Sequence, residues 1–234
     1  MFSLSPFELE TVLLSLRVAG LAILICLVPG VAIGWLLGRR NFAGKSALDL
    51  LVHLPMVAPP VVAGYLLLLA FGRNGFIGAW IYEHLGVSLA FSWAGAAMAA
   101  AIMSFPLLVR SVRLSVEAID PRLEMAAGTL GASPVKVFLS VTLPLMSPGI
   151  LAGMISAYAR ALGEFGATIT FAASIPGETR TLPLAIYALL QSPGGEAAAT
   201  RLMALSLLLA AAALIASEYF NRKILRRLKG NPEK

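Results

Sequence analysis

Two charged side chains are spaced so that they could act together within a membrane. Arg160 and Glu164 lie four residues apart at the end of an apolar run, so on a helix they would share one face. Ionisable groups at such a place are costly to maintain, which makes the pair a candidate functional site. A structural ion pair at the membrane interface explains the same spacing. The sequence leaves both interpretations open.

Common enzyme motifs are absent from the sequence. No segment matches the phosphate-binding loop GxxxxGK[ST], the metalloprotease motif HExxH or the nucleophile elbow Gly-x-Ser-x-Gly. The single cysteine, Cys26, lies in an apolar run, and His53 and His84 have no neighbours at metal-ligand spacing. We therefore expect no catalytic residue, no metal site and no ATPase activity in this chain. A stand-alone membrane enzyme or channel is the rival class, and it would need carboxylates or a metal set inside the apolar runs.

The composition is that of a polytopic membrane protein. Of the 234 residues, 59% are hydrophobic and 13% are charged, and the mean hydropathy is +0.85. Soluble domains are about 45–50% apolar and about 25% charged. The net charge of +6 falls in segments that flank the apolar runs, so topology explains it better than nucleic-acid binding. The first residues lack the basic start of a signal peptide, so we expect the first run to be a retained span.

The apolar runs predict an all-α bundle in a single transmembrane domain over 1–234. About 20 apolar residues cross a bilayer, and five uncharged runs predict full spans at about 11–38, 46–72, 88–113, 136–163 and 198–221. The segment 179–190 is apolar but short, so we expect a partial, re-entrant or sixth helix there. The second run contains Pro59 and Pro60. Broken backbone at membrane depth needs protein or a water-filled cavity around it, so these prolines either line a path or bend a packing helix.

A short amphipathic helix is predicted over 121–131. Asp120 is a suitable N-cap and Pro121 a suitable first residue. One apolar face contains residues at positions i, i+3, i+4 and i+7, namely Leu123, Ala126, Ala127 and Leu130. Gly131 stands where a left-handed C-cap is needed, and Ser133 and Pro134 start another helix. The predicted helix is about 15 Å long and cannot span a membrane. It either docks in a groove of another protein or is an ordinary interfacial connector.

Positive charge predicts the orientation. Lys and Arg collect on the cytoplasmic side of membrane proteins. Most of the 18 Lys and Arg residues lie on one side if segment 121–131 is cytoplasmic. We therefore predict that the N-terminus is outside, that the C-terminus is cytoplasmic and that five spans separate them.

The residues around this short helix follow a known pattern. Ala126-Ala127, Gly131, Val141 and Leu143-Pro144 have the spacing of Glu-Ala-Ala, three residues, Gly, nine residues, an aliphatic residue, one residue and Leu-Pro. This resembles the EAA loop of permeases in ATP-binding-cassette importers. Met125 occupies the position of the motif's glutamate. Glu124, one residue earlier, is the candidate to supply its charge.

Other stretches resemble one branch of that family, the molybdate permeases. They include HLPMVAPPVVAGYLLL (53–68), MSFPLLVRSVRLSVEAID (103–120), LGEFGATITF (162–171), IPGETRTLPLAIY (175–187) and QSPGGEAAATRL (191–202). GEFGAT with a nearby Ile-Pro-Gly is typical of sulfate and molybdate permeases alike. GETRTLP followed by SPGGE, on a chain this short, favours molybdate. A permease for sulfate or tungstate is the alternative.

The resemblance implies the fold, the partners and the location. The fold would be a type I importer permease in a bacterial or archaeal cytoplasmic membrane. The chain would form a homodimer in lipid, bound to a cytoplasmic ATPase dimer that holds ATP and Mg, and an oxyanion-binding protein would dock outside. No cofactor is expected in this chain, and no nucleic acid.

The resemblance and the residue patterns together give two sets of candidate site residues. The predicted ATPase-docking residues are Leu123, Glu124, Ala126, Ala127, Leu130 and Gly131. The predicted translocation path or gate comprises Pro59, Pro60, Arg160, Glu164, Thr168 and Thr170. An oxyanion passes most easily by weak neutral donors such as hydroxyl groups. An unpaired Glu164 would repel it, so we predict that Glu164 serves pairing or gating.

Overall fold

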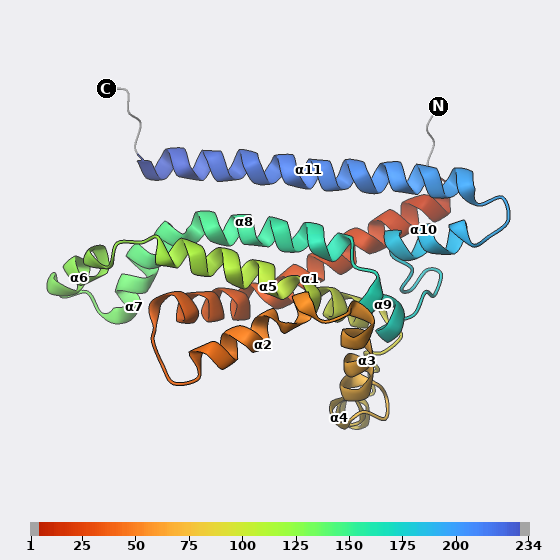
Figure 1. Ribbon diagram of the computed structural model, residues 1–234, viewed down its shortest axis with the longest axis horizontal. Helices are drawn as coiled ribbons and strands as arrows, with labels where there is room; N and C mark the ends of the chain where they lie inside the picture. Colours follow the sequence, from red (N-terminus) through yellow and green to blue (C-terminus); the bar gives the residue numbers. More distant parts are fainter. Residues whose placement is uncertain (1–4, 230–234) are drawn as a thin grey trace.

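The computed structural model describes residues 5–229, and the remaining residues of the predicted domain, 1–4 and 230–234, lie outside the described part. Helices joined by short loops make up the described residues, and no strand occurs among them (Figure 1). The elements are α1 (Pro6–Arg39), α2 (Lys45–Val57), α3 (Pro60–Phe71), α4 (Phe76–Leu85), α5 (Trp93–Glu117), α6 (Pro121–Thr129), α7 (Pro134–Val137), the π-helix η1 (Phe138–Thr142), α8 (Leu143–Leu162), α9 (Gly166–Phe171), α10 (Leu182–Leu190) and α11 (Glu196–Lys229).

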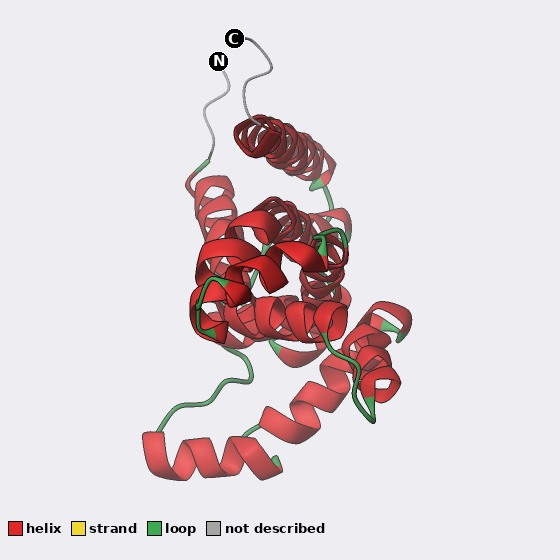
Figure 2. Ribbon diagram, turned by 90° about the vertical axis from the view of Figure 1, so that its left-hand side faces the viewer, coloured by secondary structure: helices red, strands yellow, loops and turns green. Residues whose placement is uncertain are grey.

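Three long helices, α1, α5 and α8, form the core of the bundle. Small side chains on α5 allow the close packing, and those of Ala96, Ala97, Ala100 and Ala101 are buried. Seen from its end (Figure 2), the molecule has α11 on one side of these central helices and the α2–α3 pair on the other. The small residues of α5 therefore serve helix packing.

Glycines on α1 bring its backbone close to α5. A Cβ atom added to Gly34 would lie 2.7 Å from the Cβ of Val112 and 2.9 Å from the carbonyl oxygen of Val109. One turn earlier, a Cβ on Gly30 would lie 2.7 Å from a methyl group of Leu108. Only glycine fits this crossing without movement of a neighbour, so the helix pair depends on these positions.

Two helices occupy the predicted span over 46–72, which is broken at the prolines that the sequence marks there. Helices α2 and α3 meet at an angle of 113°. Ala58 is extended, as a residue before proline prefers, and neither Pro59 nor Pro60 can donate a backbone hydrogen bond. Figure 1 shows α3 and α4 projecting away from the bundle axis.

The number of membrane-crossing helices depends on that bent pair. Within residues 5–229, four helices are long and apolar enough to cross a membrane: α1, α5, the continuous Pro134–Leu162 and the Glu196–Ala216 part of α11. The bent pair would be a fifth if its two parts count as one span.

A π-helix relieves the effect of a proline in the fourth apolar run. Phe138–Thr142 forms a wide turn between α7 and α8, just before Leu143 and Pro144. A proline within an α-helix clashes with the carbonyl group four residues earlier, and a wider turn accommodates it. The chain therefore meets Pro144 with a π-turn, whereas Pro148 lies inside α8.

Helix α10 starts three residues later than the predicted 179–190. Residues before it form a turn in which the amides of Thr179 and Arg180 donate to the carbonyl group of Ile175. The first amide of α10, from Leu182, donates to Ser15 Oγ at 2.7 Å. The helix packs against α11 through an apolar cluster that includes Ala185 and Leu202.

Candidate docking helix and translocation path

Helix α6 has the caps that the sequence predicts. The Asp120 side chain accepts a hydrogen bond from the amide of Arg122 at 2.9 Å, and Pro121 is the first helical residue. Gly131 has φ +85°. Its amide donates to the Gly128 carbonyl group at 3.0 Å and the next amide, of Ala132, to that of Ala127 at 3.2 Å. These two bonds define a Schellman cap, which ends the helix at a fixed residue.

Most of the apolar face of α6 is exposed, and only Ala127 of its four residues is half-buried. No residue of the helix is buried. Leu123 is 49% exposed and Leu130 is 88% exposed. Figure 1 shows α6 at one end of the bundle, beside α7. A large apolar side chain that stays exposed on a short, firmly capped helix marks an interaction surface. Met125, which sequence reasoning left off this surface, is 61% exposed and adjoins it.

Glu124 differs from the other predicted docking residues, because its carboxylate engages the bundle. Its Oε2 atom lies 2.7 Å from Arg39 Nε, and its Oε1 accepts a hydrogen bond from Thr142 Oγ1 at 2.6 Å. The Arg39 and Glu124 side chains are 15% and 21% exposed. Arg39 and Thr142 were missed by sequence reasoning, since nothing in their local sequence indicates a contact with α6.

The structure places the helix break at Pro59 and Pro60 beside α9, the helix that contains Thr168 and Thr170. The start of α3 packs on α9, where a Cβ added to Gly166 would lie 2.6 Å from Pro60 Cβ. One turn along α3, a Cβ on Gly64 would lie 2.8 Å from Thr170 Cβ. Pro59 and Pro60 are exposed. The helix break and the hydroxyl-bearing helix α9 are therefore neighbours, as a path made of both would require.

The two threonines of α9 differ. Thr168 is 1% exposed, so it faces the interior of this chain and not an open surface. That burial argues against the path-lining role predicted for it. Thr170 is half-buried, and its Oγ1 donates to the Gly166 carbonyl group at 2.9 Å. The difference in burial between Thr168 and Thr170 could not be predicted from the sequence, because α9 is too short to show a periodic pattern.

The predicted pairing of Arg160 with Glu164 is confirmed. Arg160 Nη1 lies 2.6 Å from Glu164 Oε2. The other carboxylate oxygen, Oε1, accepts a hydrogen bond from the amide of Ala167 at 2.9 Å. Helix α8 ends at Leu162, so the pair bridges the turn between α8 and α9 and does not lie on one continuous helix. The Glu164 side chain is 1% exposed and that of Arg160 is 34% exposed.

Replacing Glu164 should destabilise the turn between α8 and α9. Glu164→Ala leaves the Arg160 guanidinium and the Ala167 amide without their partner, so we expect a loss of about 1–3 kcal/mol. The midpoint of thermal unfolding of the purified protein in detergent measures it. Glu83→Ala removes an exposed carboxylate from α4 and is the matched control. Equal midpoints for the two variants would contradict the structural role of Glu164.

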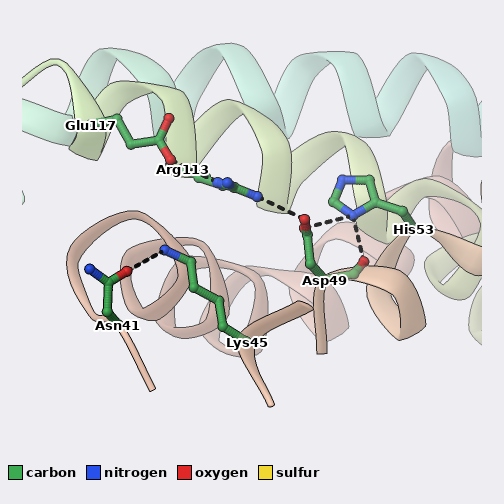
Figure 3. Close-up of polar contacts among 6 residues, drawn as sticks. All are labelled: Asn41, Lys45, Asp49, His53, Arg113 and Glu117. Carbon is green, nitrogen blue, oxygen red and sulfur yellow. Dashed lines mark hydrogen bonds and ion pairs between the residues drawn. The ribbon is translucent and has the colours of Figure 1, made fainter. Parts of the chain in front are cut away.

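A second polar cluster joins α2 to α5 near the end of α5 that leads to α6 (Figure 3). Asp49 accepts from Arg113 Nη1 at 3.0 Å, and Arg113 Nε donates to Glu117 at 2.8 Å. His53 Nδ1 lies 3.2 Å from Asp49 Oδ1. The spacing of four residues within each helix could have suggested the local pairs, Asp49 with His53 and Arg113 with Glu117. The contact between the helices could not be foreseen from spacing.

The helical bundle, its broken helices and its uncovered end helix are the features of a membrane transport subunit. Residues 30–226 match the family described as binding-protein-dependent transport system inner membrane component. The chain belongs to this family of permeases.

Individual relatives narrow the comparison. The chain is 55% identical to the molybdenum transport system permease protein ModB of Escherichia coli K12, over 92% of this chain and 94% of that one. It is 50% identical to ModB of Haemophilus influenzae, over 96% and 98% of the two chains. The sulfate transport system permease protein CysT of Escherichia coli K12 is 38% identical, over 84% of this chain and 72% of its own length.

Solved structures support the fold. A bacterial alginate ABC transporter, in complex with an alginate pentasaccharide-bound periplasmic protein, has a TM-score of 0.74 at 15% identity, over 95% of this chain and 81% of that chain. The methionine ABC transporter MetNI, in inward-facing conformations, has a TM-score of 0.70 at 16% identity, over 94% and 99%. The all-helical fold of this chain is therefore that of ABC importer permeases.

Proposed function

We propose that this chain is the transmembrane permease subunit of an ATP-binding-cassette importer that moves molybdate into the cytoplasm. The observation that carries the proposal is the 55% identity to ModB over nearly the full length of both chains. Sulfate is the less favoured cargo, since the CysT permease is 38% identical and matches over 72% of its length. A tungstate permease is the other alternative.

Within the importer, two copies of this chain form a homodimer. The described residues contain one bent helix pair, and two-fold pairing of two chains is the simplest way to enclose a path between them. A separate cytoplasmic ATPase dimer binds ATP and Mg and drives the cycle, so this chain needs no cofactor and is not itself an enzyme. An oxyanion-binding protein delivers the cargo from outside. Membrane lipid surrounds the dimer.

The ATPase docks on the exposed face of α6. The exposure of Leu123 and Leu130 supports this assignment. The small residues Ala126 and Ala127 allow close approach, and the cap at Gly131 fixes where the helix ends. Because α6 is then cytoplasmic, the C-terminus is also inside and the N-terminus is outside. Five spans fit this orientation if α2 and α3 together make one of them, with α10 as a partial helix.

The path lies beside the break between α2 and α3. Pro59 and Pro60 are exposed there, and Thr170 of α9 lies nearby, with a hydroxyl group that would serve the oxyanion once it turns away from the Gly166 carbonyl group. Weak neutral donors suit an anion that must be released again, because tight binding would slow its passage. Arg160 and Glu164 form a closed ion pair at the end of α8, which leaves neither charge free to trap the oxyanion. Movement of this pair is the candidate gating step.

Competition between anions tests the choice of cargo. The purified chain, its ATPase and its loaded binding protein are placed in proteoliposomes with ATP inside, and uptake of radiolabelled molybdate is followed. We expect a large excess of sulfate to leave uptake nearly unchanged. Suppression by sulfate would move the assignment to the sulfate permeases, and stronger suppression by tungstate than by unlabelled molybdate would make tungstate the cargo.

A further inference from the structure

One acidic side chain ties the docking helix to two long helices at once. Glu124 lies on α6, and both of its carboxylate oxygens are engaged. Oε2 lies 2.7 Å from both Nε and Nη2 of Arg39, the last residue of α1. Oε1 accepts a hydrogen bond from Thr142 Oγ1 at 2.6 Å, and Thr142 is the last residue of the π-helix that leads into α8.

The three residues form a well-enclosed junction. Thr142 is 2% exposed, and the Arg39 side chain is 15% exposed. Arg39 Nη1 also donates to the carbonyl group of Ile119, in the link between α5 and α6, at 3.3 Å. Charge-assisted hydrogen bonds of this length, shielded from water, hold a fixed geometry better than exposed pairs do.

A second contact reinforces the same junction. Trp35 of α1 meets Phe138 of η1 edge to face, with ring centroids 5.6 Å apart. Helix α1 and the π-helix are thus packed together directly, and Glu124 is the side chain by which α6 is fastened to both. The large apolar side chains of α6, Leu123, Met125 and Leu130, are exposed, so a displacement of α6 reaches α1 through the contacts of Glu124, beside the chain links that join α6 to α5 and α7.

We propose that Glu124 is the positioning residue that transmits movement of the docking helix into α1 and α8, and that it is not a contact to the ATPase. This inference rests on the proposed function, because α6 moves only if an ATPase is docked on it. The exposed face of α6 receives the displacement. The Arg39–Glu124–Thr142 junction makes α6, the end of α1 and the start of α8 move together. The π-helix η1, which ends at Thr142, connects this junction to α8.

The conservative variants are chosen to break the junction and leave the docking face intact. Glu124→Gln removes the charge and keeps the shape, and Glu124→Asp keeps the charge but shortens the side chain. Neither touches Leu123, Ala127 or Leu130. Glu117→Gln is the matched control, because it makes the same chemical change at an exposed carboxylate of α5 that pairs within its own helix.

The direct test measures whether α6 and α1 move as one unit. In the Cys26→Ala background, spin labels are placed at Asn41 and Arg122, on either side of the junction, and labelled chains are diluted with an excess of unlabelled chains so that each homodimer holds one labelled copy. Distances are measured by double electron–electron resonance in nanodiscs that hold the complex with the ATPase, with and without ATP trapped by vanadate. We expect one narrow distance that trapping leaves unchanged, in the parent and in Glu117→Gln. In both Glu124 variants we expect a broad distribution that shifts on trapping.

Transport per ATP is the second readout. We expect both Glu124 variants to assemble with the ATPase and hydrolyse ATP, with at least a tenfold lower ratio of molybdate imported to ATP hydrolysed. The exchange Arg39→Glu with Glu124→Arg restores the opposite charges and should recover much of that ratio.

The outcomes separate this inference from the function on which it rests. Failure of the unmodified chain to assemble with the ATPase would contradict the proposed function. Normal assembly of the unmodified chain and loss of assembly in both Glu124 variants would make Glu124 a docking contact and overturn the inference. Narrow, unchanged distances and a normal transport ratio in both variants would overturn it as well.

Discussion

Ala127→Arg should prevent the chain from assembling with its ATPase. Ala127 lies on the proposed docking face, between the exposed side chains of Leu123 and Leu130. A long charged side chain at this position would hold the two surfaces apart and place an unpaired charge in their contact. We expect assembly to weaken by at least about tenfold, which corresponds to 1.4 kcal/mol. Copurification of the tagged permease with the ATPase from solubilised membranes measures it.

Thr129→Arg is the control for this substitution. Thr129 is exposed on the same helix but lies off the apolar stripe, and its hydroxyl group donates to the carbonyl group of Ala126. The control therefore places the same charge on the same helix, outside the apolar stripe. We expect this variant, unlike Ala127→Arg, to retain the ATPase, while both insert into the membrane in equal amounts. If the two variants retained the ATPase equally, the assignment of α6 as the docking site would be contradicted.

Gly34→Ala should destabilise the bundle. The new Cβ would lie 2.7 Å from Val112 Cβ and 2.9 Å from the carbonyl oxygen of Val109, a backbone atom that cannot move aside easily. Overpacking of this kind costs about 1–3 kcal/mol. The larger Gly34→Leu should prevent folding. The midpoint of thermal unfolding in detergent measures the first variant, and the amount of monodisperse protein recovered measures the second.

Gly20→Ala on the same helix should change the stability of the protein in the opposite direction. A Cβ added there has no neighbour within 4 Å. Alanine is more favourable than glycine in a helix by about 1 kcal/mol, so the variant should be as stable as the parent or more stable. Comparing the Gly34→Ala and Gly20→Ala variants separates the effect of close helix approach on stability from the effect of helix propensity. A fall in stability at Gly20 as large as at Gly34 would mean that the α1–α5 crossing is not the cause.

The sequence was sufficient for features that depend on neighbouring residues. The caps at Asp120 and Gly131 and the restart at Ser133 follow from short-range hydrogen bonds, so α6 could be predicted almost to the residue. The long apolar runs predicted α1, α5, α8 and α11 for the same reason, since length and composition alone identify a helix that can cross a membrane. The Arg160–Glu164 pair was also within reach, because four residues separate its members.

Features that depend on distant residues were not predictable. Glu124 was placed with the docking face, and its inward contact arises from Arg39, 85 residues away, and from Thr142, 18 residues away. The burial of Thr168 depends on how α9 packs against α3 and α5, which no local pattern records. The prolines at 59 and 60 predicted a disturbance, but the angle of 113° between α2 and α3 is set by packing.

Uptake that depends on ATP tests the central claim most directly. Proteoliposomes holding this chain, the ATPase and the molybdate-loaded binding protein are compared with ATP inside, without ATP, and without the ATPase. We predict accumulation of radiolabelled molybdate only when ATP and the ATPase are both present, and none with the Ala127→Arg chain. Accumulation by this chain alone would contradict the account, because the chain would then be a channel or a transporter with another source of energy.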